Sequence, residues 1–176
     1  TGDIASLTVD ESDFATDDTQ SFSGAFTWDP GADGGDVAYS LEVSEPGAAS
    51  GLTDTLTGES VLLSVNAAGA VEGRTATSGD LVFTVSVDAD NGSVTLDQIR
   101  SVVHDSADVD GDISEPATID AAALMLRATV TDGDMDVSSQ AIDLGSAVSF
   151  LDDGPTIDVT GDIASLTVDE SDFATD

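Results

Sequence analysis

The strongest constraint on the fold of this chain is a duplication. Residues 160–176 repeat residues 1–17 without a single change, as TGDIASLTVDESDFATD. The two copies begin at residues 1 and 160, so the repeat period is 159 residues. That period far exceeds the 20–50 residues of solenoid repeats, so each unit is long enough to own a hydrophobic core. We therefore predict one complete unit over residues 1–159, with a linker around 152–159, and the first strand of the next unit over 160–176.

Charge decides which partners this chain can have. It carries 36 acidic residues against three cations, for a formal charge of −33, while 40% of its residues are hydrophobic and supply a core. Like-charge repulsion penalises such a fold, and nucleic acid and anionic membrane surfaces are excluded as partners. The absence of cysteine excludes disulfides and thiolate metal sites. No stretch approaches the ~20 apolar residues of a membrane span, so we expect no membrane insertion and favour cations as partners.

Alternation of apolar and polar residues predicts an all-β chain of nine to eleven short strands, arranged as a β-sandwich. Residues 121–130 include helix-favouring Ala and Leu, but their alternation favours a strand, and residues 98–104 fit either a helical turn or a strand. Asn91-Gly92 predicts a tight hairpin turn. Trp28 and Tyr39 both lie in alternating runs, which predicts that they are buried. The strands are predicted at 4–9, 21–28, 37–43, 61–65, 70–74, 81–87, 94–96, 121–130, 137–144 and 148–150.

The acidic residues gather in loops rather than along strands. Asp108, Asp110 and Asp112 alternate around a glycine, and Glu115 follows. This spacing resembles the first half of an EF-hand loop, in which alternate oxygen ligands converge on one Ca²⁺. Oxygen ligands without histidine or cysteine favour Ca²⁺ over zinc or copper, and flexible loops of several carboxylates suit Mg²⁺ less. We therefore predict a Ca²⁺ site here.

Other acidic clusters are candidates for further Ca²⁺ ions, so we expect several ions of unknown number. Asp132, Asp134 and Asp136 repeat the spacing of the first cluster. For Asp33 and Asp36, metal binding and ordinary turn formation are equally good interpretations. The acids at 88–90 are better explained by a hairpin turn than by a metal site. The remaining candidates are Asp152 and Asp153 in the linker and Asp10 and Glu11 after the first strand. One general alternative is a halophilic acidic surface without specific sites.

Residues that would support catalysis are scarce. His104 is the single histidine, and a lone histidine at the end of an apolar run is more often structural. No nucleophile elbow, phosphate-binding loop or zinc-protease motif occurs. We therefore predict that the chain is not an enzyme, and a hydrolase carried within a repeat array is the least favoured alternative.

Seven short motifs follow one another along the chain: GADG (31–34), SGLTD (50–54), VFTV (82–85), VTL (94–96), His104, TVTD (129–132) and FLDDGP (150–155). In this order they resemble the tandem repeats of giant bacterial adhesins of the repeats-in-toxin (RTX) class, which are exported by type I secretion. The most specific one is Asp-Asp-Gly-Pro before a fresh Val-Asp-Glu-Ser strand. That family usually has Asp-x-Asp-Gly-Asp after its Thr-Val-Thr strand, whereas this chain has Gly133 and Met135 in that loop.

The resemblance implies an immunoglobulin-like, Ca²⁺-dependent extender domain at the bacterial cell surface. Such repeats form a stalk, folded outside the cell, that holds a ligand-binding tip away from it. The partners would be calcium and neighbouring identical repeats in the same chain. The main alternative is a repeat that itself binds carbohydrate or a host surface.

The linker predicts how consecutive repeats meet. Pro155 fixes one φ angle and biases Gly154 towards extended conformations, so the linker is short and stiff. We expect residues 132–136 to face the preceding repeat's copies of Asp152 and Asp153, and Asp10 and Glu11 to bind ions within their own unit.

Overall fold

The computed structural model describes residues 5–104, 116–154, 157, 159–161 and 164. These residues form an all-β protein, as predicted, with two single-turn 3₁₀ helices. Proline and glycine divide the chain into short strands, and most strands bury alternate residues. The elements are β1 (Leu7–Asp10), β2 (Asp18–Ser21), η1 (Ser23–Ala25), β3 (Gly35–Val43), β4 (Ala48–Thr53), β5 (Ser60–Val65), β6 (Val71–Thr75), β7 (Leu81–Val87), β8 (Ser93–Gln98), β9 (Pro116–Thr118), β10 (Leu124–Asp132), β11 (Val137–Asp143), η2 (Gly145–Ala147) and β12 (Val148–Leu151).

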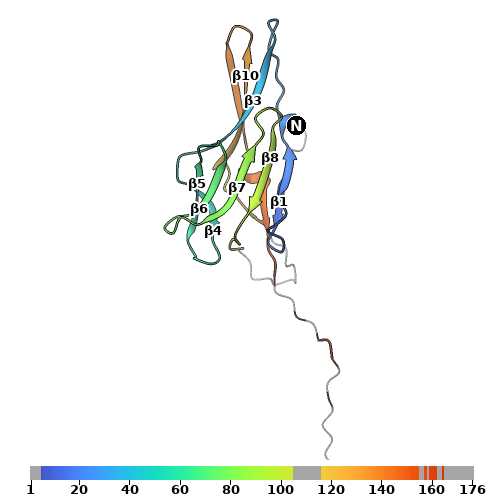
Figure 1. The fold of residues 1–176 in the computed structure, drawn as a ribbon, viewed down its shortest axis with the longest axis vertical. Helices are drawn as coiled ribbons and strands as arrows, with labels where there is room; N and C mark the ends of the chain where they lie inside the picture. The colour runs from blue at the N-terminus through green and yellow to red at the C-terminus, as the bar shows by residue number, and fades with distance from the viewer. Residues whose placement is uncertain (1–4, 105–115, 155–156, 158, 162–163, 165–176) are drawn as a thin grey trace, which may run out of the picture.

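Within the described residues the strands form three sheets that pack as a β-sandwich (Figure 1). The largest has the order β2-β8-β7-β6-β5-β4, and β3 of the sheet β11-β10-β3 lies across its β5, β6 and β7. The third sheet, β1-β12-β9, contains one parallel pair, β1 with β12. Side chains from all three sheets share one core, in which Phe22, Phe83 and Phe150 are almost fully buried.

Strands β3, β10 and β11 extend beyond the rest of the sandwich (Figure 1). We call this extension the arm; it comprises residues 35–39, 128–132 and 137–140 of the three strands. Residues 26–34 run along the arm to its free end, which we call the tip. The described part of the C-terminal segment leaves the opposite end, which we call the base. The molecule is therefore elongated, with acidic loops at the tip and the exit of the chain at the base.

Most predicted strands are confirmed, including the ambiguous segment that became β10. The prediction of a strand over 21–28 is wrong: β2 ends at Ser21, and η1 turns the chain before it follows the arm. Phe22 is buried and Phe26 packs against the core, but a Cβ atom added at Gly24 would meet nothing within 4 Å, so the alternating residues 22–28 do not form one continuous buried face. Residues 98–104 form neither predicted element, since β8 ends at Gln98 and Val102 makes one isolated bridge to Asp54.

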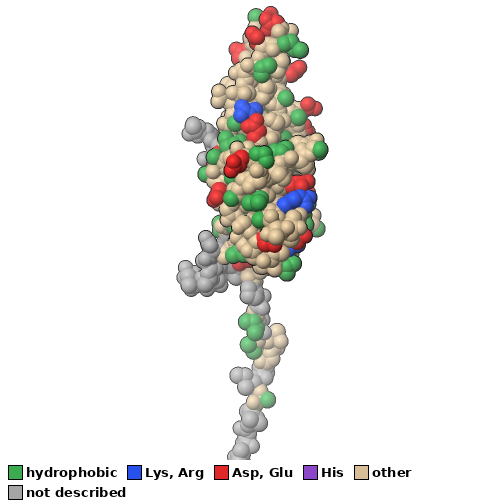
Figure 2. Space-filling model, turned by 90° about the vertical axis from the view of Figure 1, so that its left-hand side faces the viewer, with side chains coloured by type: hydrophobic (Ala, Val, Ile, Leu, Met, Phe, Trp, Pro, Cys, Tyr) green, Lys and Arg blue, Asp and Glu red, His purple; other side chains and the backbone are tan. Residues whose placement is uncertain are grey.

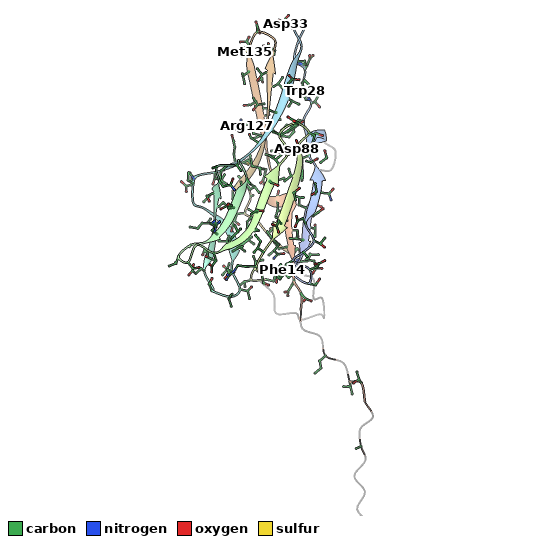
Figure 3. The ribbon with its side chains drawn as sticks, in the orientation of Figure 1. Phe14, Trp28, Asp33, Asp88, Arg127 and Met135 are labelled. Carbon is green, nitrogen blue, oxygen red and sulfur yellow. The ribbon has the colours of Figure 1, made fainter. Side chains whose placement is uncertain are left out.

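The predicted burial of the two large aromatic residues is half correct. Tyr39 is 4% exposed and stacks at a tilt against Phe26, with ring centroids 5.9 Å apart. Trp28 is 42% exposed, because the segment that carries it lies outside the sandwich and beside the arm (Figure 3).

Candidate functional site

Two hairpin-like loops meet at the tip of the arm. In the register of β3 and β10, Gly35 lies opposite Asp132, so the loop before β3 and the loop after β10 are neighbours. A Cβ atom on Gly133 would lie 2.8 Å from the Asp33 backbone oxygen, and only glycine allows this approach. Figure 3 places Asp33 and Met135 together at this end, and Figure 2 shows acidic side chains gathered there. The tip thus unites two acidic loops that are about a hundred residues apart in sequence.

Three of the predicted ligands converge at the tip. Asp132, Asp134 and Asp136 each place a carboxylate oxygen within 4.8 Å of the other two. Asp132 organises the loop, since its Oδ1 accepts backbone N–H groups from Asp136 at 2.8 Å and from Asp134 at 3.2 Å. Hydrogen bonding with the Asp134 side chain, followed by these backbone groups, holds the pKa of the Asp132 carboxyl below its ordinary range. The side chains of Asp134 and Asp136 remain exposed.

Asp33 and Asp36, which were also predicted as possible ligands, lie beside this group without belonging fully to it. The backbone of Asp33 touches the 132–136 loop, while Asp36 pairs with Thr131 inside the sheet and is exposed. The two acids are therefore close to the three converging carboxylates without forming a separate cluster with one another.

A second group of possible ligands lies at the base. Glu11, His104 and Asp152 each bring one ligand atom within 4.8 Å of the others. The side chains of Glu11 and His104 are 7% and 4% exposed, and His104 Nε2 lies 3.3 Å from Glu11 Oε1. That oxygen also accepts the backbone N–H of Val102 at 2.8 Å and the Gln98 side-chain amide at 3.2 Å. β1 and β12 run in parallel, and this pairing brings Glu11 and Asp152 together just beyond the ends of the two strands.

Sequence reasoning placed Glu11 and Asp152 among the ligands but did not include His104 with them. The histidine had the features of a structural residue, and Glu11 precedes it by 93 residues. Within the described part of the chain, Nδ1 of His104 and Oε1 of Gln98 are buried without a hydrogen-bond partner. In the sequence, His104 is a lone histidine directly after an apolar run. This position indicates a buried histidine but does not reveal which carboxylates lie near it.

The other linker and strand-end acids are placed differently. Asp10 Oδ1 accepts the Ser12 backbone N–H at 2.8 Å and stabilises the turn after β1, and hydrogen bonding by Ser12 lowers the pKa of this exposed carboxyl. Asp153 is exposed and belongs to neither group of converging ligands. The predicted ligands Asp108, Asp110, Asp112 and Glu115 lie outside the described residues.

The residues present fit Ca²⁺ best at the tip. Three carboxylates on one short loop, with a backbone carbonyl next to it, are the hard oxygen ligands that Ca²⁺ takes. At the base the donor set is mixed, because an imidazole stands beside two carboxylates, and imidazole is a ligand that transition metals accept more readily.

All three arginines are engaged by acids, so they do not neutralise either group. Arg74 pairs with Glu72, and Arg127 pairs across the sheet with Glu42. Arg100 forms two hydrogen bonds to the fully buried Asp54, at 2.8 and 2.9 Å. Hydrogen bonds from Arg100, more than those from Thr57, lower the pKa of Asp54 to about 2. This network is structural, and no pattern in the sequence indicated it.

A shallow groove runs along the arm between residues 26–30 and strands β10 and β11. It has a volume of about 190 Å³ beside Trp28, and it continues towards the tip past Asp29, Val130 and Ser138 to Asp132 and Asp136. Its floor is apolar, from Ala128 and Val130, and one wall carries the half-exposed Trp28 ring.

Among known protein families, residues 6–145 match the one described as a domain of unknown function (DUF5801). No curated protein and no solved structure matches this chain. Within the described residues no helix is long and apolar enough to cross a membrane.

Proposed function

The chain belongs to the DUF5801 family, and we propose that it serves as a calcium-dependent spacer repeat in a large bacterial adhesin at the cell surface. In this proposal the repeat is an immunoglobulin-like extender without enzymatic activity. Copies of it, joined in series, would project a distal ligand-binding region away from the cell. The partners of each repeat are Ca²⁺ and its two neighbours.

The observation that carries the proposal is the position of the acidic groups. Converging carboxylates stand at the two opposite ends of an elongated sandwich, and the chain leaves one of these ends (Figure 1). Beyond that end, residues 160–176 repeat the sequence of residues 1–17. In an array, consecutive repeats would meet at these two ends of the sandwich. Ions bound there would both relieve the repulsion between like charges and fix the angle between neighbours.

The charge of the whole chain supports the same conclusion. At a formal charge of −33 with every arginine already paired, folding without added cations leaves carboxylates close together at the tip. Modules outside cells bind Ca²⁺ at about 10⁻⁴–10⁻³ M, so millimolar Ca²⁺ would occupy such sites and stabilise the folded state by mass action.

Thermal unfolding in Ca²⁺ and in EDTA, at matched ionic strength, tests the proposal. We expect a higher melting temperature in Ca²⁺. Equal melting temperatures would contradict it, and an equal gain from added NaCl would favour the halophilic alternative.

A site variant sharpens this test. Asp134→Asn removes one ligand at the tip and keeps the backbone hydrogen bonds that Asp132 organises. We expect calorimetry to count one Ca²⁺ fewer than in the wild type, with stability in EDTA unchanged or slightly higher. Asp90→Asn is the matched control, because Asp90 is an exposed acid in a hairpin turn away from both groups and should leave the count unchanged.

One observation favours the alternative in which each repeat binds carbohydrate. Trp28 is half exposed beside a groove that is also lined by Ser138 and Gln140, which lie opposite Val130 and Ala128 on the same face of the arm. Titration with neutral oligosaccharides, followed by Trp28 fluorescence, distinguishes this function, since a spacer repeat should show no response.

A further inference from the structure

We propose that the group at the base of the sandwich, Glu11, His104 and Asp152, binds one divalent transition-metal ion of the Zn²⁺ type within a single repeat. This inference goes beyond the proposed function, because it concerns an ion other than Ca²⁺ and needs no neighbouring repeat. The bound ion would fasten the ends of β1 and β12 to each other at the point where the chain leaves the sandwich.

Hydrogen bonds of the backbone hold the three ligands in place. The Glu11 N–H donates to the Leu151 carbonyl at 3.1 Å, which continues the parallel pairing of β1 and β12 and sets Asp152 beside Glu11. The third segment is fixed by Val102, whose N–H donates to Glu11 Oε1 at 2.8 Å and which precedes His104 by two residues. The ligands thus come from three separate segments that the fold itself brings together.

Two unpartnered polar atoms mark the same place. Among the described residues, the buried side-chain nitrogen and oxygen atoms without a hydrogen-bond partner are His104 Nδ1 and Gln98 Oε1. Both belong to side chains that contact Glu11 Oε1, through Gln98 Nε2 at 3.2 Å and His104 Nε2 at 3.3 Å. Buried polar groups are nearly always satisfied, and an exception calls for a bound water or ion. Here both exceptions surround one carboxylate, which points to a ligand at this carboxylate.

The contact between His104 and Glu11 has the length expected of two ligands of one ion. Its 3.3 Å exceeds the roughly 2.7–2.9 Å of a charge-assisted N–H···O hydrogen bond. Two ligands of a tetrahedral ion, each roughly 2.0–2.1 Å from the metal, lie roughly 3.3–3.4 Å apart. An oxygen of Asp152 lies within 4.8 Å of one ligand atom of each of the other two side chains, in reach of a third ligand position.

The donor set selects the class of ion. Zn²⁺ accepts both imidazole nitrogen and carboxylate oxygen, whereas Ca²⁺ takes six to eight oxygen ligands. The side chains of Glu11 and His104 are 7% and 4% exposed, which leaves little room for the waters that Ca²⁺ would need to complete its shell. Two carboxylates and a neutral imidazole also balance the charge of one divalent ion. The three arginines cannot supply that charge, because each pairs with other acids.

The base site is compatible with a junction between repeats. A carboxylate has two oxygens, and one oxygen of Asp152 is enough for the ion at the base. The second oxygen and the exposed Asp153 stay available to a neighbouring repeat.

The experiment uses His104, the single histidine of the chain, as its reporter. Zn²⁺ is added to the full chain in saturating Ca²⁺, which occupies the oxygen-only sites first. We expect one equivalent of Zn²⁺ to shift the ring-proton NMR signals of His104, and calorimetry to count one Zn²⁺ that excess Ca²⁺ does not displace. Ca²⁺ alone should leave the ring signals in place.

Variants identify the ligands. His104→Gln should weaken this Zn²⁺ binding by at least about tenfold, since even residues that only support a metal ligand cost that much. Asp152→Asn should weaken it as well and should reduce the shift of the His104 signals at a given Zn²⁺ concentration. This second variant keeps the contact of His104 with Glu11, so it provides the test even if His104→Gln does not fold. Asp153→Asn is the matched control, because Asp153 is the next residue and is exposed outside the group.

Three results would overturn the inference. They are ring signals that Zn²⁺ leaves unchanged, ring signals that Ca²⁺ shifts in the same way as Zn²⁺, and a Zn²⁺ affinity that Asp152→Asn and Asp153→Asn reduce equally. The second result would mean that the base is another calcium site.

This proposal and the spacer function fail separately. If Zn²⁺ shifts the His104 signals while Ca²⁺ leaves the melting temperature unchanged, the base site stands and the calcium-dependent function is wrong. If Ca²⁺ raises the melting temperature while Zn²⁺ leaves His104 unaffected, the spacer function stands and the transition-metal site is wrong.

Discussion

At the scale of single residues, Met135 has an unusual backbone conformation in the tip loop. Met135 has a φ of 75°, in the left-handed region that favours glycine, and its side chain is 77% exposed. The RTX adhesin repeats that the sequence resembles carry glycine at this place in the loop. Methionine at this position therefore has a physical consequence, which is local backbone strain at Met135.

Met135→Gly should therefore stabilise the protein. A non-glycine residue in this conformation costs roughly 1–2 kcal/mol, and part of that is offset by the roughly 0.5–1 kcal/mol of extra chain entropy that glycine loses on folding. We expect a net gain of about 0.5–1 kcal/mol in urea unfolding in EDTA. Met135→Ala is the control, because alanine keeps the Cβ atom, and equal stability of both variants would contradict the explanation.

The buried ion pair of Asp54 with Arg100 should contribute strongly to the stability of the fold. Its carboxylate is fully buried and held by Arg100 and by the hydroxyl and N–H of Thr57. Arg100→Met would leave this charge unpaired, and we expect a loss of about 3–5 kcal/mol in the free energy of unfolding near neutral pH. Arg74→Met removes a more exposed pair and should cost about 0–1 kcal/mol.

The pH dependence of this loss follows from the pKa of Asp54. The folded-state value of about 2 lies below the ordinary 3.8, so the pairing contributes stability that is present above pH 4 and disappears as the pH falls towards 2. The shift corresponds to about 2 kcal/mol. The difference between wild type and Arg100→Met should therefore shrink across that window, and a constant difference would show that Asp54 is not responsible.

At the scale of elements, alternation predicted the strands in which apolar residues recur at every second position. It missed β4, whose buried residues Ala48, Ser50 and Leu52 include a small and a polar side chain. β3, β7 and β10 were readable because apolar residues recur at every second position. β2 (Asp18–Ser21) contains no apolar residue, and β9 (Pro116–Thr118) has three residues, so neither carried a local signal.

Of the two candidate sites, one was predictable from local sequence and the other was not. The tip carboxylates lie within five residues of one another, so their spacing alone predicted them. The base group joins Glu11, His104 and Asp152 from three distant segments through the parallel pairing of β1 and β12. Local sequence does not encode a parallel pairing between the first and last strands of a unit, and this is why His104 was read as an isolated structural residue.

Gly73 provides a test of how β6 and β7 pack. It lies opposite Phe83 in the register of the two strands, and a Cβ atom at this position would be 2.3 Å from the phenyl ring. Gly73→Ala should overpack the core and cost about 1–3 kcal/mol in the free energy of unfolding. Gly24→Ala is the control, since no atom lies within 4 Å of its added Cβ, and equal loss in both variants would mean that the phenyl ring moves aside freely.

At the scale of the whole molecule, the separation of the two groups of possible ligands determines how bound ions would affect the array of repeats. The tip and the base lie at opposite ends of the sandwich, so an ion shared between repeats, as proposed, would fix the angle between their long axes. Acids at such junctions repel each other without cations and attract a shared cation when one is present. A series of repeats should thus be bent and variable in EDTA and straight in Ca²⁺.

Small-angle scattering on a two-repeat protein tests this last prediction. We expect Ca²⁺ to lengthen and narrow the distance distribution relative to EDTA, because the tip of the second repeat then shares ions with Asp152 and Asp153 of the first. Asp134→Asn with Asp136→Asn in the second repeat should abolish the lengthening. The same pair of substitutions in the first repeat, whose tip faces no neighbour, is the matched control and should preserve it. If the Ca²⁺ and EDTA profiles of the wild type superimpose while both repeats stay folded, the junction is not stiffened by metal, and a calcium-dependent spacer is the wrong function for this chain.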